Sequence, residues 1–260
     1  MSKNPHQTIL LLLMAMLLCM ISVPTHVEAN ADDKTIIMFI PDTDWPPYLI
    51  NDPRYPGGGV LLEVMRAVVT PLGYEVKTCR LPNKRGWELL NCREVDAHAK
   101  AKEWVRDPDN YQWTAPFMLH EDVLLYRMNS NFEYTEPKAL YGKTLVGIKG
   151  FIYPTLEPHF GPGKIHRIDV SNPFAMLELL NLGRVDAAIV NRNETLWLFK
   201  NRPDLNPERF RLDSKPFGSA GYRYVFNNDK RWAPLIEKFN ARLDEMKRNG
   251  DLDKILDQYR

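Results

Sequence analysis

Residues 184–190 read Arg-Val-Asp-Ala-Ala-Ile-Val, and residues 93–99 read Arg-Glu-Val-Asp-Ala-His-Ala. In both places a segment with apolar residues at helical spacing comes first, and a short apolar run follows the aspartate. Gly183 stands before the later copy, where a glycine typically ends a helix. Because helix, Val-Asp-Ala and strand recur in the same order in both halves, the sequence predicts two lobes of similar construction.

The segment around the earlier copy alternates between strand and helix patterns. Apolar runs rich in β-branched residues predict strands, and apolar residues at helical spacing predict helices. The predicted strands are 35–40, 74–79 and 95–99, and the predicted helices are 60–69 and 84–91. A β-α-β-α-β series with short connections indicates a parallel sheet in an α/β fold.

The second half repeats this order, with predicted strands at 144–148 and 165–169, a helix at 173–182, and a strand after Asp186. Two further strands, 122–127 and 222–226, are placed where the chain would cross between the lobes. Segments 231–247 and 252–259 carry apolar residues on one helical face and predict closing helices. We expect residues 32–126 to start lobe 1, 127–217 to form lobe 2, and 218–260 to return to lobe 1.

The N-terminal stretch has the pattern of a secretory signal peptide. Lys3 precedes a mainly apolar run of 15 residues, 9–23, and Ala29 and Ala31 offer small residues for cleavage. An uncleaved anchor helix is the alternative, but the run is shorter than the roughly 20 residues that span a bilayer. We therefore expect residues 1–31 to be removed and the mature protein to lie in the periplasm.

Composition narrows the class of protein. At 44% hydrophobic and 26% charged residues, the chain is globular, and a net charge of +1 argues against a general nucleic-acid binder. No two histidines fall three or four residues apart, and no hydrolase or metalloprotease motif occurs, so we expect no metal, no cofactor and no catalytic residue. We also expect a monomer.

Two cysteines, Cys79 and Cys92, follow the predicted signal peptide. An oxidising compartment would allow them to pair. However, if Cys79 ends a strand and Cys92 ends the following helix, about 12 Å separates them, which exceeds the span of a disulfide. We expect free thiols, with a disulfide as the alternative.

Several motifs together resemble the family 3 periplasmic solute-binding proteins, the amino-acid-type receptors of ABC importers. They are Asp42-x-x-Trp45-x-Pro47-Tyr48, Leu81-Pro82, Thr114-Ala115-Pro116-Phe117, the stretch 140–147, Gly183-Arg184-Val185-Asp186-Ala187 and the C-terminal helices. The resemblance covers nearly all of residues 35–260. It implies two α/β lobes in the Venus flytrap arrangement, two crossover hinge strands, and a polar ligand held between the lobes, whose binding energy drives closure.

The resemblance also implies ligand-binding residues in the first lobe. Trp45 matches the aromatic of the first loop and would stack on the ligand, with Tyr48 in the same motif. Arg106, two positions before the family's usual arginine, would clamp a carboxylate. Lys100 and Arg85 would add positive charge near the cleft. Surface positions without a ligand are the alternative for the last three.

The second lobe departs from the family pattern. Asn191 stands where the family carries the acid that meets an ammonium group, and Tyr153 follows a glycine-aromatic pair that resembles a ligand-contacting loop. With an amide in place of the acid and cations predicted nearby, the sequence favours a small carboxylate-bearing solute.

Two other functions share this fold. One is a receptor that feeds a separate membrane sensor in place of an ABC permease. The other is an enzyme like the cyclohexadienyl-acid dehydratases, which would use a cleft carboxylate such as Glu103 or Glu194.

Overall fold

The structure is a computed structural model that describes residues 34–160 and 163–259. The predicted signal peptide, 1–31, lies outside the described residues. None of the helices in the described ranges combines the length and apolar character needed to cross a bilayer.

The first lobe is built on three parallel strands, as the sequence predicts. Strand β1 (Thr35–Pro41) lies between β2 (Glu75–Leu81) and β3 (Ala97–Ala101). Helices α2 (Val60–Val69) and α3 (Asn83–Asn91) are the connections between these strands. The observed bounds differ from the predicted ones by two residues or fewer at each end.

The second lobe has the same construction. Strand β6 (Thr144–Ile148) pairs in parallel with both β7 (His166–Val170) and β8 (Ala187–Asn191). Helix α5 (Pro173–Asn181) joins β7 to β8, and the short α4 (Glu157–Phe160) precedes β7. The predicted repeat is therefore present in the structure: each Val-Asp-Ala motif leads from a helix into a central parallel strand.

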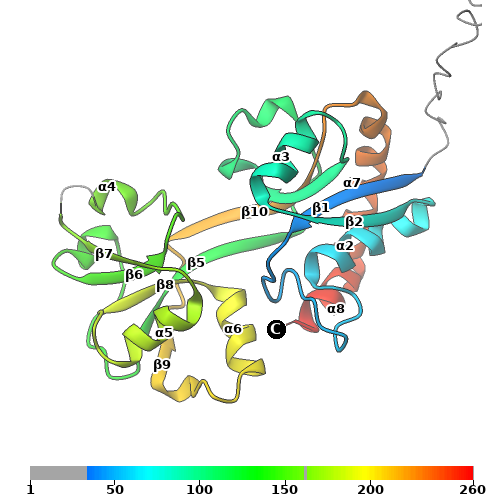
Figure 1. Ribbon diagram of the computed structural model, residues 1–260. Coiled ribbons are helices and arrows are strands. Elements are labelled where there is room, and N and C mark those ends of the chain that lie inside the picture. Colours follow the sequence, from blue (N-terminus) through cyan, green and yellow to red (C-terminus); the bar gives the residue numbers. More distant parts are fainter. Residues whose placement is uncertain (1–33, 161–162, 260) are drawn as a thin grey trace, which may run out of the picture. The chain divides into compact units, whose positions relative to one another are not determined.

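Strands β5 (Met118–Arg127) and β10 (Gly218–Phe226) join the two lobes and run antiparallel to each other (Figure 1). The end of β5 pairs with β8, and the end of β10 pairs with β3. Both strands begin four residues earlier than the sequence predicts, and the added residues, 118–121 and 218–221, form most of the mutual pairing. The mixed α/β sheet with two crossover strands confirms the predicted fold class.

The remaining elements extend these two units. Helices α7 (Ala233–Asn249) and α8 (Asp251–Asp257) close the chain, close to the predicted segments. Helix α6 (Arg192–Asn201) follows β8 directly and was not predicted. Short strands β4 (Gln112–Trp113) and β9 (Phe210–Leu212) pair with β10 and β5, and 3-10 turns lie at 70–72, 102–104, 108–110, 137–140, 207–209 and 230–232.

The apolar cores divide in the same way as the sheet. One large cluster combines β1, α2 and β3 with the faces of α7 and α8, so the C-terminal helices pack on the first lobe. Two other clusters contain only residues from 123 to 217 and form the two faces of the second lobe. The exact domain boundaries stay a prediction.

Cys79 and Cys92 are free thiols in the structure; Cys79 is half-buried and Cys92 is exposed.

Helix α3 packs on the first sheet through a glycine. The ring of Phe39 on β1 is fully buried and stacks on His98 of β3, with 3.9 Å between the ring centroids. Burial lowers the pKa of His98 to about 3, so this histidine is a neutral core residue. A Cβ atom at Gly86 would lie 2.3 Å from the Phe39 ring. The absence of a side chain at Gly86 is what allows this close approach.

Gly86→Ala is expected to destabilise the protein by about 1–2 kcal/mol, because overpacking against Phe39 outweighs the gain in helix propensity. Urea unfolding followed by circular dichroism measures the change. Lys84→Ala, at an exposed position of the same helix, is the control. If the Gly86→Ala variant is more stable than wild type, the gain in helix propensity outweighs any clash with Phe39, and the packing argument is wrong.

Candidate functional site

The loop that carries Trp45 is fixed to the start of helix α2. The carbonyl groups of Pro47 and Tyr48 accept hydrogen bonds from the amides of Val60 (3.0 Å) and Leu61 (3.1 Å), which are otherwise unpaired at a helix N-terminus. Gly59, at φ +100°, makes this possible, because a Cβ there would lie 2.5 Å from the Tyr48 carbonyl oxygen. The first turn of α2 therefore positions the aromatic side chains of the loop.

These aromatic side chains pack against rings from β5 and β10. The ring centroids of Trp45 and Tyr48 lie 4.3 Å apart, and Tyr48 stacks on Tyr222 at 5.9 Å. His120 of β5 stacks on Tyr222 at 5.7 Å and contacts the Trp104 ring in a T-shaped arrangement at 4.7 Å. The crossover strands are thus held to the first lobe by an aromatic cluster beside the site.

Asn191 connects this loop to the second lobe. Its side-chain oxygen accepts a hydrogen bond from the Tyr48 hydroxyl (2.7 Å) and another from the backbone amide of Glu194 (2.9 Å), which caps helix α6. Its side-chain amide donates to the Glu121 carbonyl at 3.4 Å. Both ends of the Asn191 side chain are therefore engaged within the protein.

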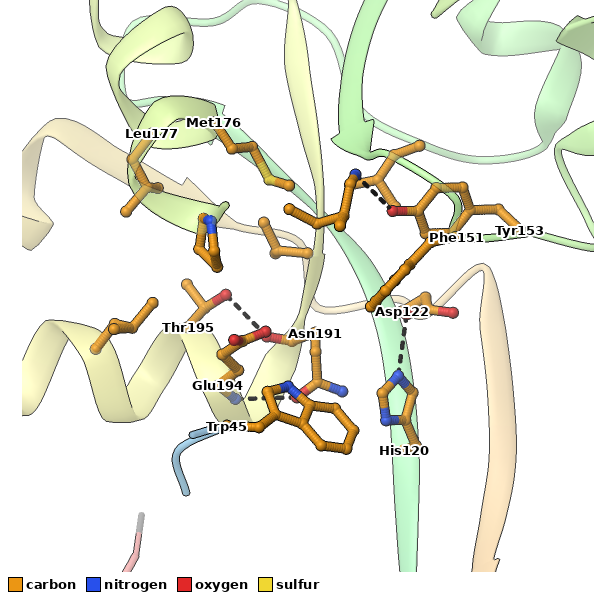
Figure 2. Close-up of a pocket in the computed structure, with 15 residues that line it drawn as sticks. Trp45, His120, Asp122, Phe151, Tyr153, Met176, Leu177, Asn191, Glu194 and Thr195 are labelled. Atoms are coloured by element: carbon orange, nitrogen blue, oxygen red, sulfur yellow. Dashed lines mark hydrogen bonds and ion pairs between the residues drawn. The ribbon is translucent and has the colours of Figure 1, made fainter. Parts of the chain in front are cut away.

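A small cavity lies where the loop, strand β5 and the second lobe meet (Figure 2). Its free volume is about 40 Å³, room for a water molecule or two. Residues from both lobes line it: Trp45, His120, Asp122, Ile148, Phe151, Tyr153, Pro173, Met176, Leu177, Ile189, Val190, Asn191, Glu194, Thr195 and Leu198.

Glu194 is the most perturbed acid in this cavity. Burial raises the pKa of its carboxyl group to about 7 from an ordinary 4.5, and the neighbouring Trp45 side chain, drawn beside it in Figure 2, offsets this only in part. Among the described residues, Glu194 has no ion pair within 4 Å. No cation of the described residues therefore stabilises the charged form of Glu194.

His120 and Asp122 form the wall supplied by strand β5. Because residues two apart in a strand face the same side, both side chains point toward the cavity, and His120 Nε2 lies 3.3 Å from Asp122 Oδ1. The other ring nitrogen of His120, Nδ1, is buried and has no hydrogen-bond partner in the part of the chain that the structure describes. A polar group of a ligand would satisfy it.

The structure brings three of the predicted site residues to the cavity: Trp45, Tyr153 and Asn191. Tyr48 is buried beside them and bonds to Asn191. The Tyr153 hydroxyl accepts a hydrogen bond from the amide of Ile148 (3.1 Å), and burial raises its pKa to about 12. Their role in ligand binding stays a prediction.

The three predicted cations lie outside the cavity lining. Arg85 is exposed and pairs with Glu88 at 3.4 Å, and Arg106 is exposed. Lys100 is half-buried, with its Nζ 5.6 Å from the centre of the Trp104 ring, and burial lowers its pKa. Lys100 is connected to the cavity through Trp104, whose ring contacts the lining residue His120.

Sequence reasoning did not assign His120 or Asp122 to the site, and it considered Glu194 only as a catalytic carboxylate. The pair Asn191 and Glu194 carries a signal that could have found helix α6: a capping residue followed three positions later by glutamate is typical of a helix start. No group of three metal-ligating side chains occurs among residues 34–160 and 163–259.

Residues 37–260 match the family model described as bacterial extracellular solute-binding proteins, family 3. Among curated proteins, the chain is 25% identical over 257 residues to membrane-bound lytic murein transglycosylase F of Pseudomonas savastanoi pv. phaseolicola (strain 1448A / Race 6), covering 91% of this chain and 47% of that protein. The chain thus spans less than half the length of the curated relatives it matches.

Solved structures share the fold. A histidine kinase sensor domain with similarity to periplasmic binding proteins superposes with a TM-score of 0.64 at 19% identity, covering 86% of this chain and 95% of the other. The second substrate-binding domain of a putative amino acid ABC transporter from Streptococcus pneumoniae Canada MDR_19A gives a TM-score of 0.63 at 18% identity, with coverage of 86% and 99%.

Glu194→Gln is expected to change how stability depends on pH. Between about pH 4.5 and 7, the folded chain keeps the Glu194 proton while the unfolded chain releases it, so the wild type loses stability as the pH rises through this window. Relative to wild type, the variant should gain about 1–3 kcal/mol between pH 4 and pH 8, with allowance for solvent screening. Urea unfolding at several pH values measures this gain.

The exposed Glu178→Gln on helix α5 is the matched control and should show no such trend. A stability difference between Glu194→Gln and wild type that stays constant from pH 4 to pH 8 would contradict the raised pKa.

Proposed function

Because the chain belongs to the bacterial extracellular solute-binding proteins, family 3, we propose that it is a periplasmic receptor for a small, carboxylate-bearing, amino-acid-like solute. It binds this solute between its lobes and delivers it to an ABC importer.

One observation carries the proposal: a single cavity takes side chains from the Trp45 loop, from crossover strand β5 and from the second lobe. A ligand in that position contacts both lobes only when they are close together, so its binding energy favours the closed arrangement. The cavity of about 40 Å³ is smaller than an amino acid, so a ligand enters by widening it. Strands β5 and β10 are the connections about which the lobes would part.

Lys100 is the cation best placed to meet a ligand carboxylate. It is half-buried, and no carboxylate lies within 4 Å of its Nζ among the described residues. A buried ammonium without an anion is costly, and a ligand carboxylate would compensate it. The buried Nδ1 of His120, whose ring contacts Trp104, would add a hydrogen bond.

The similarity to a substrate-binding domain of a putative amino acid ABC transporter supports transport as the role. The similarity to a histidine kinase sensor domain favours a second candidate, a receptor that reports its ligand to a membrane sensor. Both candidates require the same binding event. A permease or a kinase recovered by crosslinking to the ligand-bound protein would separate them.

A thermal-shift screen of the twenty L-amino acids and simple monocarboxylic acids tests the proposed function. A ligand that binds only the folded state stabilises it by roughly 2.7 kcal/mol at a hundredfold excess over Kd. Lys100→Gln is expected to weaken every carboxylate ligand by about 10- to 100-fold, measured by calorimetry. Lys102→Gln, whose lysine pairs with Asp109 at 3.3 Å, is the matched control.

Two results would count against this function. No stabilisation by any compound in the screen would remove the receptor proposal. Hits that are consumed, as shown by mass spectrometry of the incubated ligand, would replace it with the dehydratase-like enzyme, in which Glu194 would be the cleft carboxylate.

A further inference from the structure

Two carboxylic acids, Asp122 and Glu194, line the cavity. Its ionisable lining consists of Asp122, Glu194, His120 and Tyr153, and no lysine or arginine belongs to it. The cavity wall therefore attracts positive charge, and any cation for a carboxylate must come from beyond it. One of these acids, Glu194, lies close to position 191, where this chain has an asparagine in place of the family's acid.

Asn191 cannot serve as the acceptor for a ligand ammonium group. One lone pair of its oxygen takes the Tyr48 hydroxyl and the other takes the Glu194 amide, so its acceptor capacity is used. The Glu194 side chain, one helical turn further, lines the cavity beside Trp45, and among the described residues it forms no ion pair. Its raised pKa agrees with a carboxylate that lacks a cation.

The other wall of the cavity is apolar and comes from the second lobe. Met176 and Leu177 of α5 and Leu198 of α6 are buried there, and Val190 of β8 packs in the same apolar cluster as Met176 and Leu177. Leu198 lies four residues after Glu194, on the same face of helix α6. Figure 2 shows Glu194 beside Trp45, with Met176 and Leu177 at the far end of the cavity.

We propose that the ligand is an amino acid with an apolar side chain, whose ammonium group binds Glu194 and whose side chain packs on Met176, Leu177 and Leu198. This rests on the proposed receptor function. The spacing is suitable, because an i, i+4 pair on a helix sets a charge and an apolar contact about 5–6 Å apart. Glu194 thus determines specificity for the amine, and Leu198 determines specificity for the side chain.

Three matched compounds separate the contribution of the ammonium group to binding from that of the carboxylate. They are L-leucine, 4-methylpentanoate, which lacks the amine, and 3-methylbutylamine, which lacks the carboxylate. By calorimetry, L-leucine should bind at least tenfold more tightly than 4-methylpentanoate, and L-glutamate and L-arginine should bind more weakly than L-leucine. Burying a second charge against the apolar wall is unfavourable.

Glu194→Gln should lower affinity for L-leucine by about 10- to 100-fold and leave 4-methylpentanoate unchanged. Leu198→Ala should lower affinity for L-leucine about tenfold while leaving L-alanine unchanged. Glu178→Gln, an exposed acid next to Leu177, should affect neither ligand. Circular dichroism confirms that each variant is folded.

The outcomes distinguish this inference from the function it rests on. Equal binding of L-leucine and 4-methylpentanoate, unchanged L-leucine affinity in Glu194→Gln, or a preference for L-glutamate would overturn the inference while the receptor function stands. Failure of every amino acid and carboxylic acid to bind would overturn the receptor function itself.

Discussion

The pairing of β5 with β10 is the constraint on which the rest of the structure depends. Residues 118–122 of one strand face residues 218–222 of the other, and the pairing of each strand with a lobe begins at the last residue of this stretch, Asp122 or Tyr222. A buried strand must satisfy its backbone hydrogen bonds along its whole length. The parallel strands of the two lobes are therefore joined through the pairing of β5 with β10. His120 and Asp122 lie near the point where the partner of β5 changes from β10 to β8.

Much of this fold could be predicted from the sequence because its central strands are short apolar runs bounded by glycine and proline. The crossover strands were predicted too short, since residues 118–121 and 218–221 mix polar, small and exposed side chains and lack the pattern of a buried strand. Their extended conformation comes from pairing with each other. Helix α6 was missed because its buried residues, Thr195 and Leu198, are too few to give a clear helical period.

The candidate site was predictable only in part, for a related reason. Trp45, Tyr153 and Asn191 stand in motifs with a fixed local position, and the cavity includes all three. Arg106 was matched to the family pattern with a shift of two residues in a loop, and Arg85 by a motif at the start of helix α3; both side chains are exposed. Glu194 belongs to helix α6, which the sequence did not predict. His120 lies in the part of β5 that precedes the predicted strand, and Asp122 is the first residue of the predicted strand. Residues that tertiary pairing alone brings together leave no periodic signal in the chain.

The small volume of the cavity bears on the rate of ligand exchange. With about 40 Å³ of free space and walls supplied by both lobes, the cavity takes in or releases a larger solute when those walls part. The residence time of a bound solute is then limited by how often the walls part, a property of the protein. Solutes of different affinity would therefore share the same maximum dissociation rate. Their actual dissociation rates would differ because each solute slows the separation of the walls to a different extent.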